Sequence, residues 1–145
     1  MMNIIFVCTG NTCRSPMAEG IFKKLLKDNN IENVEVISAG LYANDGSFAT
    51  RQAKKATEKL GADISEHMSH NLTRADIRTA DLIVCMNTTH YEALKPIIPE
   101  DKLCVLGNGI SDPYGQSQEV YDSCAREINS SLKDLMIKVK EKIKK

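Results

Sequence analysis

The sequence predicts an α/β fold with a four-stranded parallel sheet and helices on both faces. Two observations carry this prediction. Short apolar segments rich in β-branched residues alternate with segments of helical periodicity along the whole chain. No repeat, linker or low-complexity tract interrupts that alternation. The 145 residues, with 42% hydrophobic and 26% charged side chains, fit one globular domain spanning 1–145.

The first three expected elements surround a short polar loop. Asn3–Val7 is an apolar run that ends at Cys8 and is expected to form a buried strand. Ser15 followed by proline is typical of a helix start, and apolar residues at helical spacing extend that helix to about 28. Val34–Ala39 is the second expected strand, closed by a glycine.

The middle of the chain is expected to contain three helices and one strand. An Asn-Asp-Gly turn precedes a helix over 47–60, which a glycine ends. A short helix over 73–79 leads into an apolar strand over 81–86. A further helix over 88–95 stops before two prolines.

The last two elements are a strand over 102–106 and a helix from 117 to about 144, joined by a loop that contains Asp112. The long helix has one apolar stripe and a lysine-rich C-terminal end, where the helix dipole favours positive charge. Ligands of parallel α/β sheets bind beyond the carboxyl ends of the strands. The Cys8 loop and the Asp112 loop both follow strands, so they are expected to meet there.

Composition excludes several classes of function. The chain has 19 basic and 19 acidic residues, so no overall field attracts nucleic acid or an anionic membrane. No apolar run is long enough to span a bilayer. Five cysteines, an odd number without zinc-ligand spacing, indicate reduced thiols and no metal site. We therefore expect a monomeric cytoplasmic protein.

The segment from Cys8 to Ser15 reads CTGNTCRS. It lacks the Gly-Lys-Ser/Thr ending of a Walker A loop, and instead places Cys8 and Arg14 six positions apart between a strand and a helix. Such a loop can direct backbone N–H groups and a helix N-terminus at one tetrahedral anion, while Arg14 holds two of its oxygens. The same positive field favours a Cys8 thiolate, which can attack phosphorus. The alternative is that Cys8 is only a core residue at a strand end.

These residues closely resemble the low-molecular-weight protein tyrosine phosphatase family, whose loop reads C-x-G-N-x-C-R-S-P. The resemblance continues in the MAE, SAG, MSH and DPY motifs, in order along the chain. It implies a flavodoxin-like three-layer sandwich, phosphorylated protein substrates, and catalysis through phosphocysteine without metal or cofactor. Cys8 is then the nucleophile, Arg14 the phosphoryl clamp and Asp112 the general acid. The phosphate-binding loop consists of Thr9, Gly10, Asn11, Thr12, Cys13, Arg14 and Ser15.

Supporting roles follow from residue chemistry and from the resemblance. Asn11 tolerates left-handed backbone, and Ser15 can hydrogen-bond the Cys8 sulfur. The resemblance places His70 behind the loop, bonded to Asn11 and Ser15, and it gives no role to His67 or His90. Asp112 lies in an ordinary turn sequence, but a leaving group needs a proton and neither loop has a histidine.

Two positions bear on the substrate. Thr12 replaces the bulky apolar residue of tyrosine-specific members, and Gly115 follows Asp-Pro-Tyr where many members have a second aromatic residue. Both features resemble the bacterial protein-arginine phosphatases of this family. In those enzymes the threonine selects phosphoarginine and the aspartate contacts its guanidinium, a pairing that a phenol cannot make. A tyrosine phosphatase remains the alternative.

Two alternative functions belong to other classes. An arsenate reductase would need further cysteines to relay a disulfide, and a cysteine phosphocarrier should not need Arg14 together with an acid such as Asp112. The remaining cysteines are expected in the core: Cys85 and Cys104 in strands, and Cys124 on an apolar helix face. Cys13 has two open interpretations. It either protects Cys8 by forming a disulfide on oxidation or packs beneath the loop.

Overall fold

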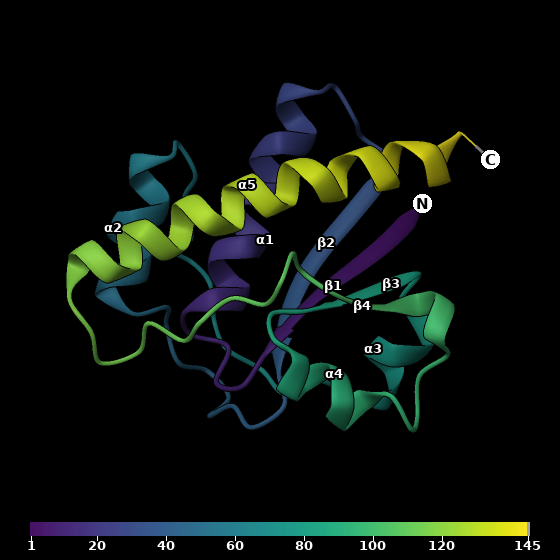
Figure 1. Ribbon diagram of the computed structural model, residues 1–145, viewed down its shortest axis with the longest axis horizontal. Coiled ribbons are helices and arrows are strands. Elements are labelled where there is room, and N and C mark those ends of the chain that lie inside the picture. The colour runs from purple at the N-terminus through teal and green to yellow at the C-terminus, as the bar shows by residue number, and fades with distance from the viewer. Residues whose placement is uncertain (145) are drawn as a thin grey trace.

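A computed structural model describes residues 1–144 and contains a four-stranded parallel sheet (Figure 1). The strands run in the order β2-β1-β3-β4, which is the flavodoxin-like order over its first four positions. Their bounds are β1 Met2–Cys8, β2 Val34–Gly40, β3 Leu82–Cys85 and β4 Leu103–Val105. The predicted fold class and the number and direction of its strands are confirmed.

The helices form one layer on each face of the sheet (Figure 1). Helices α1 (Arg14–Asp28), α2 (Arg51–Lys59) and α5 (Gln118–Ile143) contact one another on one face. Helices α3 (Arg74–Thr79) and α4 (Thr88–Leu94) cover the other, and a 3-10 turn, η1 (Glu100–Lys102), precedes β4. None of the helices over residues 1–144 has the length and apolar character needed to cross a bilayer.

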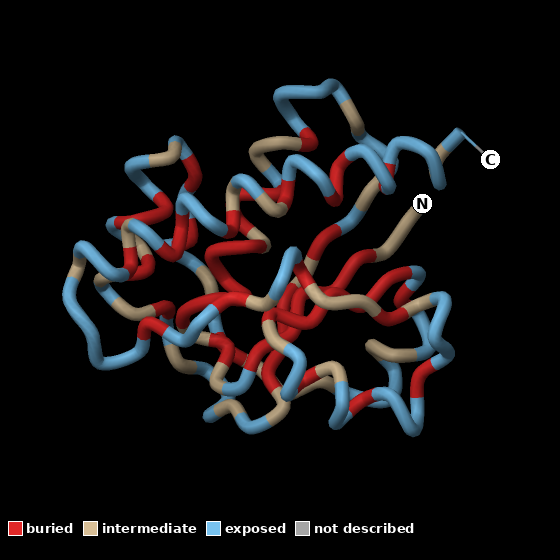
Figure 2. Tube along the Cα trace, in the orientation of Figure 1, coloured by how far each residue is buried: buried red, intermediate tan, exposed pale blue. Residues whose placement is uncertain are grey.

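Strand β1 supplies the core on both faces, since successive side chains of a strand point in opposite directions. Ile4 and Phe6 pack in the cluster beneath α1 and α5, whereas Ile5 and Val7 pack in the cluster beneath α4. All four side chains are buried, and Figure 2 shows the buried segments concentrated along the sheet. The continuous apolar run recognised in the sequence is therefore a central strand covered on both faces.

The strand order places the carboxyl end of β1 at a topological switch point. The chain leaves β1 for β2 on one side and returns to β3 on the other. Cys8 pairs with Gly40 of β2, and the Met86 N–H just past β3 donates to the Val7 carbonyl at 2.9 Å. The loops after β1, β2 and β3 therefore lie together, which is where ligands of such sheets bind.

Two helix starts differ from their predicted positions. Helix α1 begins at Arg14 with Cys13 at the N-cap, so Ser15 is inside its first turn and does not cap it. Helix α2 begins at Arg51, and not at residue 47, because the Thr50 hydroxyl caps it by accepting from the Ala53 N–H. Phe48, expected to be helical, instead bridges to Met68 in an extended segment. Both errors arise where loop contacts compete with helix formation.

Candidate active site

A cavity of about 440 Å³ opens at the carboxyl end of the sheet. The whole loop from Cys8 to Arg14 lines it. The remaining lining residues come from the loops after β2 and before α5: Tyr42, Asn44, Ser47, Phe48, Thr50, Asp112 and Tyr114. The structure therefore brings the predicted nucleophile, clamp and acid to one cavity, and Ser15 lies buried beneath the loop.

The loop curls because Asn11 adopts left-handed backbone, with φ of 56°. Asparagine tolerates this region better than most side chains. The turn brings the Asn11 N–H to 3.3 Å from the Cys8 sulfur, which accepts its hydrogen bond. Helix α1 starts where the loop ends, so its positive N-terminal end faces the same region. The arrangement suits a thiolate and a tetrahedral anion.

The Ser15 hydroxyl lies between the Asn11 side chain and the Cys8 sulfur. The Asn11 Oδ1 atom accepts from the His70 backbone N–H at 3.1 Å, so the amide nitrogen faces the other way. That nitrogen donates to Ser15 Oγ at 2.8 Å. Because a thiolate has no proton to give, the Ser15 hydroxyl is the donor to an ionised Cys8 sulfur, at 2.8 Å. A donated hydrogen bond stabilises the anionic sulfur both as attacker and as leaving group.

Further residues fix the Asn11 side chain and main chain from below. The Asn11 amide also donates to the Ser38 hydroxyl at 3.1 Å, and Ser38 donates to Glu19 at 2.6 Å. His67 Nε2 donates to the Asn11 carbonyl at 2.8 Å, which places the ring proton on Nε2. No role was predicted for Ser38 or Glu19, although they lie in the SAG and MAE motifs, respectively.

His70 bonds Asn11 as expected, through its backbone N–H, whereas the expected bond to Ser15 is absent from the described residues. Its ring is partly exposed and lies 3.6 Å from an Asp76 carboxylate oxygen. Two histidine rings to which no role was given bond the loop: that of His67 at the Asn11 carbonyl, and that of His90 at the Thr9 hydroxyl. His67 and His70 lie three positions apart in an irregular segment, where no periodicity in the sequence shows which side chain turns inward.

Arg14 and Asp112 approach each other across the cavity. The Arg14 side chain is 6% exposed and donates to the Ile110 carbonyl at 3.0 Å, which fixes its guanidinium. Its second terminal nitrogen lies 3.7 Å from an Asp112 carboxylate oxygen, whose side chain is 53% exposed. The other Asp112 oxygen accepts from the Tyr114 N–H at 3.1 Å. A fixed cation thus faces an accessible carboxyl group.

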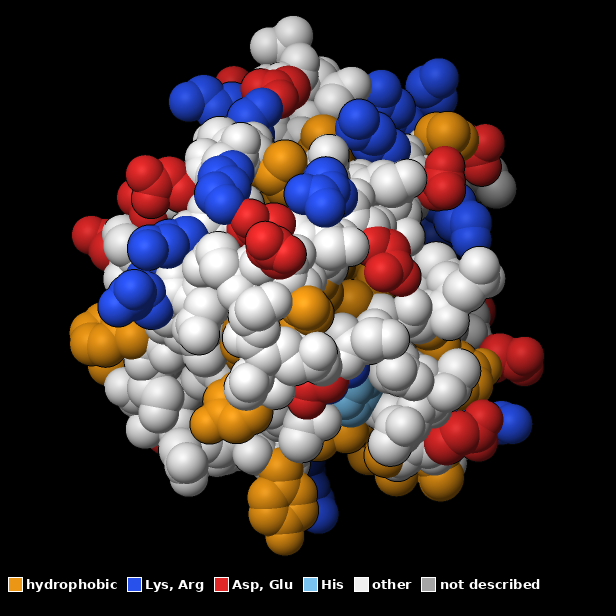
Figure 3. All heavy atoms as spheres, turned by 60° about the vertical axis from the view of Figure 1, so that its left-hand side comes forward, with side chains coloured by type: hydrophobic (Ala, Val, Ile, Leu, Met, Phe, Trp, Pro, Cys, Tyr) orange, Lys and Arg blue, Asp and Glu red, His pale blue; other side chains and the backbone are white. Residues whose placement is uncertain are grey.

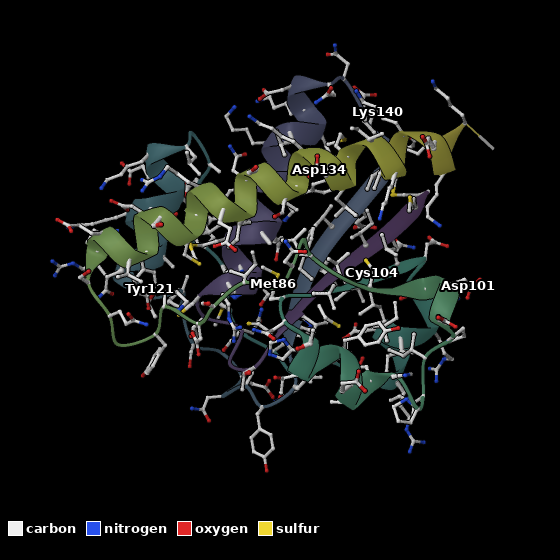
Figure 4. All side chains as sticks on the ribbon, in the orientation of Figure 1. Met86, Asp101, Cys104, Tyr121, Asp134 and Lys140 are labelled. Carbon is white, nitrogen blue, oxygen red and sulfur yellow. The ribbon has the colours of Figure 1, made fainter. Side chains whose placement is uncertain are left out.

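The remaining cysteines differ from Cys8 in their surroundings. Cys13 lies 3.2 Å from the hydroxyl of Tyr121, near the start of α5 (Figure 4), and burial raises the pKa of its thiol. Burial also raises the pKa of Cys85 and of Cys124 to about 12, and all five cysteines are free thiols. Cys85 and Cys124 are buried as predicted, while Cys104 is half-buried.

Three aromatic rings form the rim of the cavity. Tyr42, Phe48 and Tyr114 are all exposed, Tyr42 to 89%. Figure 3 shows hydrophobic side chains projecting at the lower edge of the face it presents, while acidic and basic side chains are interspersed above them. Gly115, which follows Tyr114, has φ of +77° and open space around it. No side chain therefore closes that part of the rim.

Comparison with known proteins identifies the family. Residues 3–145 match the model of the family described as low molecular weight phosphotyrosine protein phosphatase. A protein-arginine-phosphatase of Bacillus subtilis (strain 168) is 34% identical, and the alignment covers 97% of this chain and 98% of that protein.

Two solved structures have the same fold. A low molecular weight protein tyrosine phosphatase from T. tengcongensis has a TM-score of 0.89 and 38% identity, over 95% of this chain and 99% of that one. A mutant of the YwlE arginine phosphatase with a phosphorylated active-site serine has a TM-score of 0.88 and 34% identity, over 96% of each chain. The chain therefore belongs to the low molecular weight phosphotyrosine protein phosphatase family and is a phosphatase enzyme.

Proposed function

We propose that this enzyme hydrolyses phosphoarginine on proteins, through a phosphocysteine intermediate on Cys8. The observation that carries the proposal is the polar loop side chain of Thr12 in a cavity that also presents the Asp112 carboxyl group. The phosphate-binding loop after Cys8 holds the phosphoryl group, and Asp112 donates and accepts the protons that the reaction requires.

In the first step the Cys8 thiolate attacks phosphorus and the phosphorus–nitrogen bond breaks. Asp112 gives its proton to the departing guanidino nitrogen. The loop N–H groups and the Arg14 guanidinium hold the phosphoryl oxygens as their charge redistributes. The Ser15 hydroxyl, directed at the sulfur from 2.8 Å, stabilises the attacking thiolate. The products are phosphocysteine on the enzyme and an unphosphorylated arginine side chain on the substrate protein.

In the second step Asp112 takes a proton from water, whose oxygen attacks phosphorus. The sulfur–phosphorus bond breaks, which releases inorganic phosphate and restores the Cys8 thiolate. The Ser15 hydroxyl again donates to sulfur, now as the leaving group. A covalent phosphoryl intermediate on Cys8 is supported by the similar arginine phosphatase mutant, whose active-site serine is phosphorylated.

Three features of the cavity favour a guanidinium over a phenol. The Asp112 carboxylate can pair with a guanidinium, as it does with Arg14 at 3.7 Å. Thr12 presents a hydroxyl where an apolar side chain would pack on a ring, and Gly115 adds no second aromatic wall. The name of the Bacillus subtilis relative, protein-arginine-phosphatase, points the same way.

Tyrosine phosphatase activity is the second candidate, because three exposed aromatic rings surround the cavity. The T. tengcongensis structure, 38% identical, is of a protein tyrosine phosphatase. Arsenate reduction is less favoured, since Cys85 and Cys124 are buried and neither lines the cavity. A phosphocarrier is also less favoured, because it should not need Arg14 together with a facing acid such as Asp112.

The deciding experiment compares kcat/KM on two peptides of identical flanking sequence, one with phosphoarginine and one with phosphotyrosine. We expect the phosphoarginine peptide to be the better substrate. Tyrosine hydrolysis faster by tenfold or more would overturn the arginine assignment and leave the phosphatase assignment intact. Thr12→Ile should shift the ratio toward phosphotyrosine, whereas Thr89→Ile, exposed on α4 outside the cavity, should leave it unchanged.

For Cys13 we propose protection of Cys8 through a disulfide formed on oxidation, with packing against Tyr121 as the alternative. Both cysteines belong to the same short loop, which supports the protective role. Peptide mapping after mild peroxide treatment separates the two. A Cys8–Cys13 disulfide is expected, and sulfinylated Cys8 beside unmodified Cys13 would exclude protection.

A further inference from the structure

His90 is a buried histidine that the proposed mechanism does not use. It lies in the first half of α4, the short helix that follows β3. Because β3 pairs with β1 and Met86 bonds Val7 at the strand end, this helix starts beside the Cys8 loop. The ring is 3% exposed, so its polar atoms must find partners inside the protein or go without.

One ring nitrogen has a partner and the other does not. His90 Nε2 lies 2.9 Å from the hydroxyl oxygen of Thr9, the residue directly after the nucleophile. Nδ1 is buried and makes no hydrogen bond to any residue of the described chain. The Thr9 hydroxyl has no other side-chain partner within residues 1–144, and its backbone carbonyl accepts from the Tyr42 N–H at 2.9 Å. Thr9 is therefore held from two sides, by the loop that follows β2 and by helix α4.

Burial, more than the charges nearby, keeps the His90 ring neutral. Burial first and the Arg14 guanidinium second lower the pKa of His90 to about 4, while the Asp112 carboxylate acts in the opposite sense. A neutral ring carries one N–H. A buried N–H without a partner is rarer in proteins than an acceptor without one, which places the proton on Nε2. His90 then donates to Thr9 Oγ1, and the Thr9 hydroxyl proton is free.

We propose that His90 is a positioning residue of the phosphate-binding loop, which acts by donating a hydrogen bond to Thr9. That bond fixes the first turn of the loop against α4 and leaves the Thr9 hydroxyl as a donor toward the cavity that Thr9 lines. The bound anion thereby gains one oriented hydroxyl in addition to the backbone N–H groups. This inference rests on the proposed function of the loop.

The expected consequence concerns anion affinity as well as turnover. Without the His90 bond the Thr9 hydroxyl can turn away from the phosphoryl group, and the adjacent N–H groups lose their fixed direction. One lost hydrogen bond to a charged group corresponds to a loss of about tenfold. The inhibition constant of inorganic phosphate should rise, and kcat/KM for an aryl phosphate should fall.

A double-mutant cycle tests the proposal on the intact enzyme. His90→Leu, Thr9→Val and the double variant are compared for kcat and KM on p-nitrophenyl phosphate and for inhibition by inorganic phosphate. Each single variant should lose about tenfold in kcat/KM and in phosphate affinity, and the double variant should lose no more than either. His90→Gln, which keeps a donor near the position of Nε2, should recover most of the loss.

The controls separate positioning from stability. Tyr91→Leu alters the next residue of α4, which packs against the core cluster beneath that helix, and should lower the melting temperature without changing phosphate inhibition. If His90→Leu does not fold, Thr9→Val and His90→Gln carry the test, because Thr9 is exposed. Unchanged phosphate inhibition in Thr9→Val, or losses that multiply in the double variant, would overturn the proposal. Absence of turnover in the unaltered enzyme would instead contradict the proposed function.

Discussion

At the scale of single residues, Cys8 depends on a neighbour whose side-chain orientation is fixed. Asn11 is fully buried, and its side-chain amide oxygen accepts from a backbone N–H that can only donate. Its amide nitrogen must then donate to Ser15, and because a thiolate has no proton to give, Ser15 in turn donates to the ionised sulfur. The loop therefore directs a donor at Cys8 before any substrate binds, which is how a site stabilises charge without reorganising.

Removing that donor gives the first prediction. Ser15→Ala should lower kcat by about 10- to 100-fold, because a hydrogen bond to a charged group contributes about 1.5–3 kcal/mol. The rate of Cys8 alkylation by iodoacetamide should fall with it, since the sulfur loses a hydrogen bond that stabilises its anionic form. Ser130→Ala, exposed on α5, is the matched control and should change neither rate. An unchanged alkylation rate in Ser15→Ala would contradict the assigned proton direction.

His90 gives the second prediction, on stability and pH. Its pKa is about 4 in the folded protein, through burial first and the Arg14 charge second, against the ordinary 6.5. Between these values the unfolded chain binds more protons, so stability falls as pH falls from 6.5 toward 4. We expect the free energy of unfolding to drop by about 2 kcal/mol more in the unaltered protein than in His90→Gln between pH 7.5 and 5. Urea unfolding of both at the two pH values measures this, and equal drops would refute it.

At the scale of elements, the helix starts show what local sequence can predict. Ser-Pro correctly indicated a helix that continues to Asp28, but the helix begins one residue before the serine. Cys13 occupies the N-cap position, and its carbonyl accepts from the Met17 N–H. The helix begins this early because the phosphate-binding loop ends at Cys13 in a backbone turn that leads directly into it. Helix α2 starts late for a similar reason, because Ser47 and Phe48 pair with residues 68–69 in an extended segment. Local propensity predicts the elements, and tertiary contacts set their first residues.

The packing of α1 gives the third prediction. Gly20 lies inside that helix, where alanine would ordinarily stabilise by about 0.5–1 kcal/mol. Here a Cβ on Gly20 would overlap Ile64 Cγ2 and would also contact Thr57. Gly20→Ala should therefore destabilise by about 1–2 kcal/mol in spite of its helix propensity. Chemical denaturation measures the change.

A second variant shows whether the overlap is the cause. Ile64→Ala removes the obstructing atoms, so Gly20→Ala made in that background should be neutral or stabilising. A destabilisation by Gly20→Ala that is equal in both backgrounds would mean that the steric contact with Ile64 does not explain it.

At the scale of the whole molecule, the sequence predicted the sheet and the meeting of two loops, because alternating strands and helices constrain topology strongly. It did not predict contacts between irregular segments. The inward turn of His67, and the approach of Tyr121 to Cys13 across 108 positions, depend on how layers pack. The roles of Cys8, Arg14 and Asp112, the single domain, the monomeric state and the cytoplasmic location stay predictions.

The last prediction tests the meeting of the two loops in catalysis. If Asp112 protonates the leaving group and later activates water, Asp112→Asn should lower turnover of a phosphoarginine peptide by about 10²- to 10⁴-fold. With p-nitrophenyl phosphate, whose leaving group needs little protonation, only the second step should slow. Phosphocysteine should then accumulate, and rapid-quench or mass measurement should detect a phosphorylated enzyme on Cys8. Asp101 (labelled in Figure 4) is an exposed residue of η1, which precedes β4, and it does not line the cavity. Asp101→Asn should therefore behave as the unaltered enzyme. Equal slowing of both substrates without a covalent intermediate would remove Asp112 from the second step, and unchanged turnover of the peptide would remove it from catalysis.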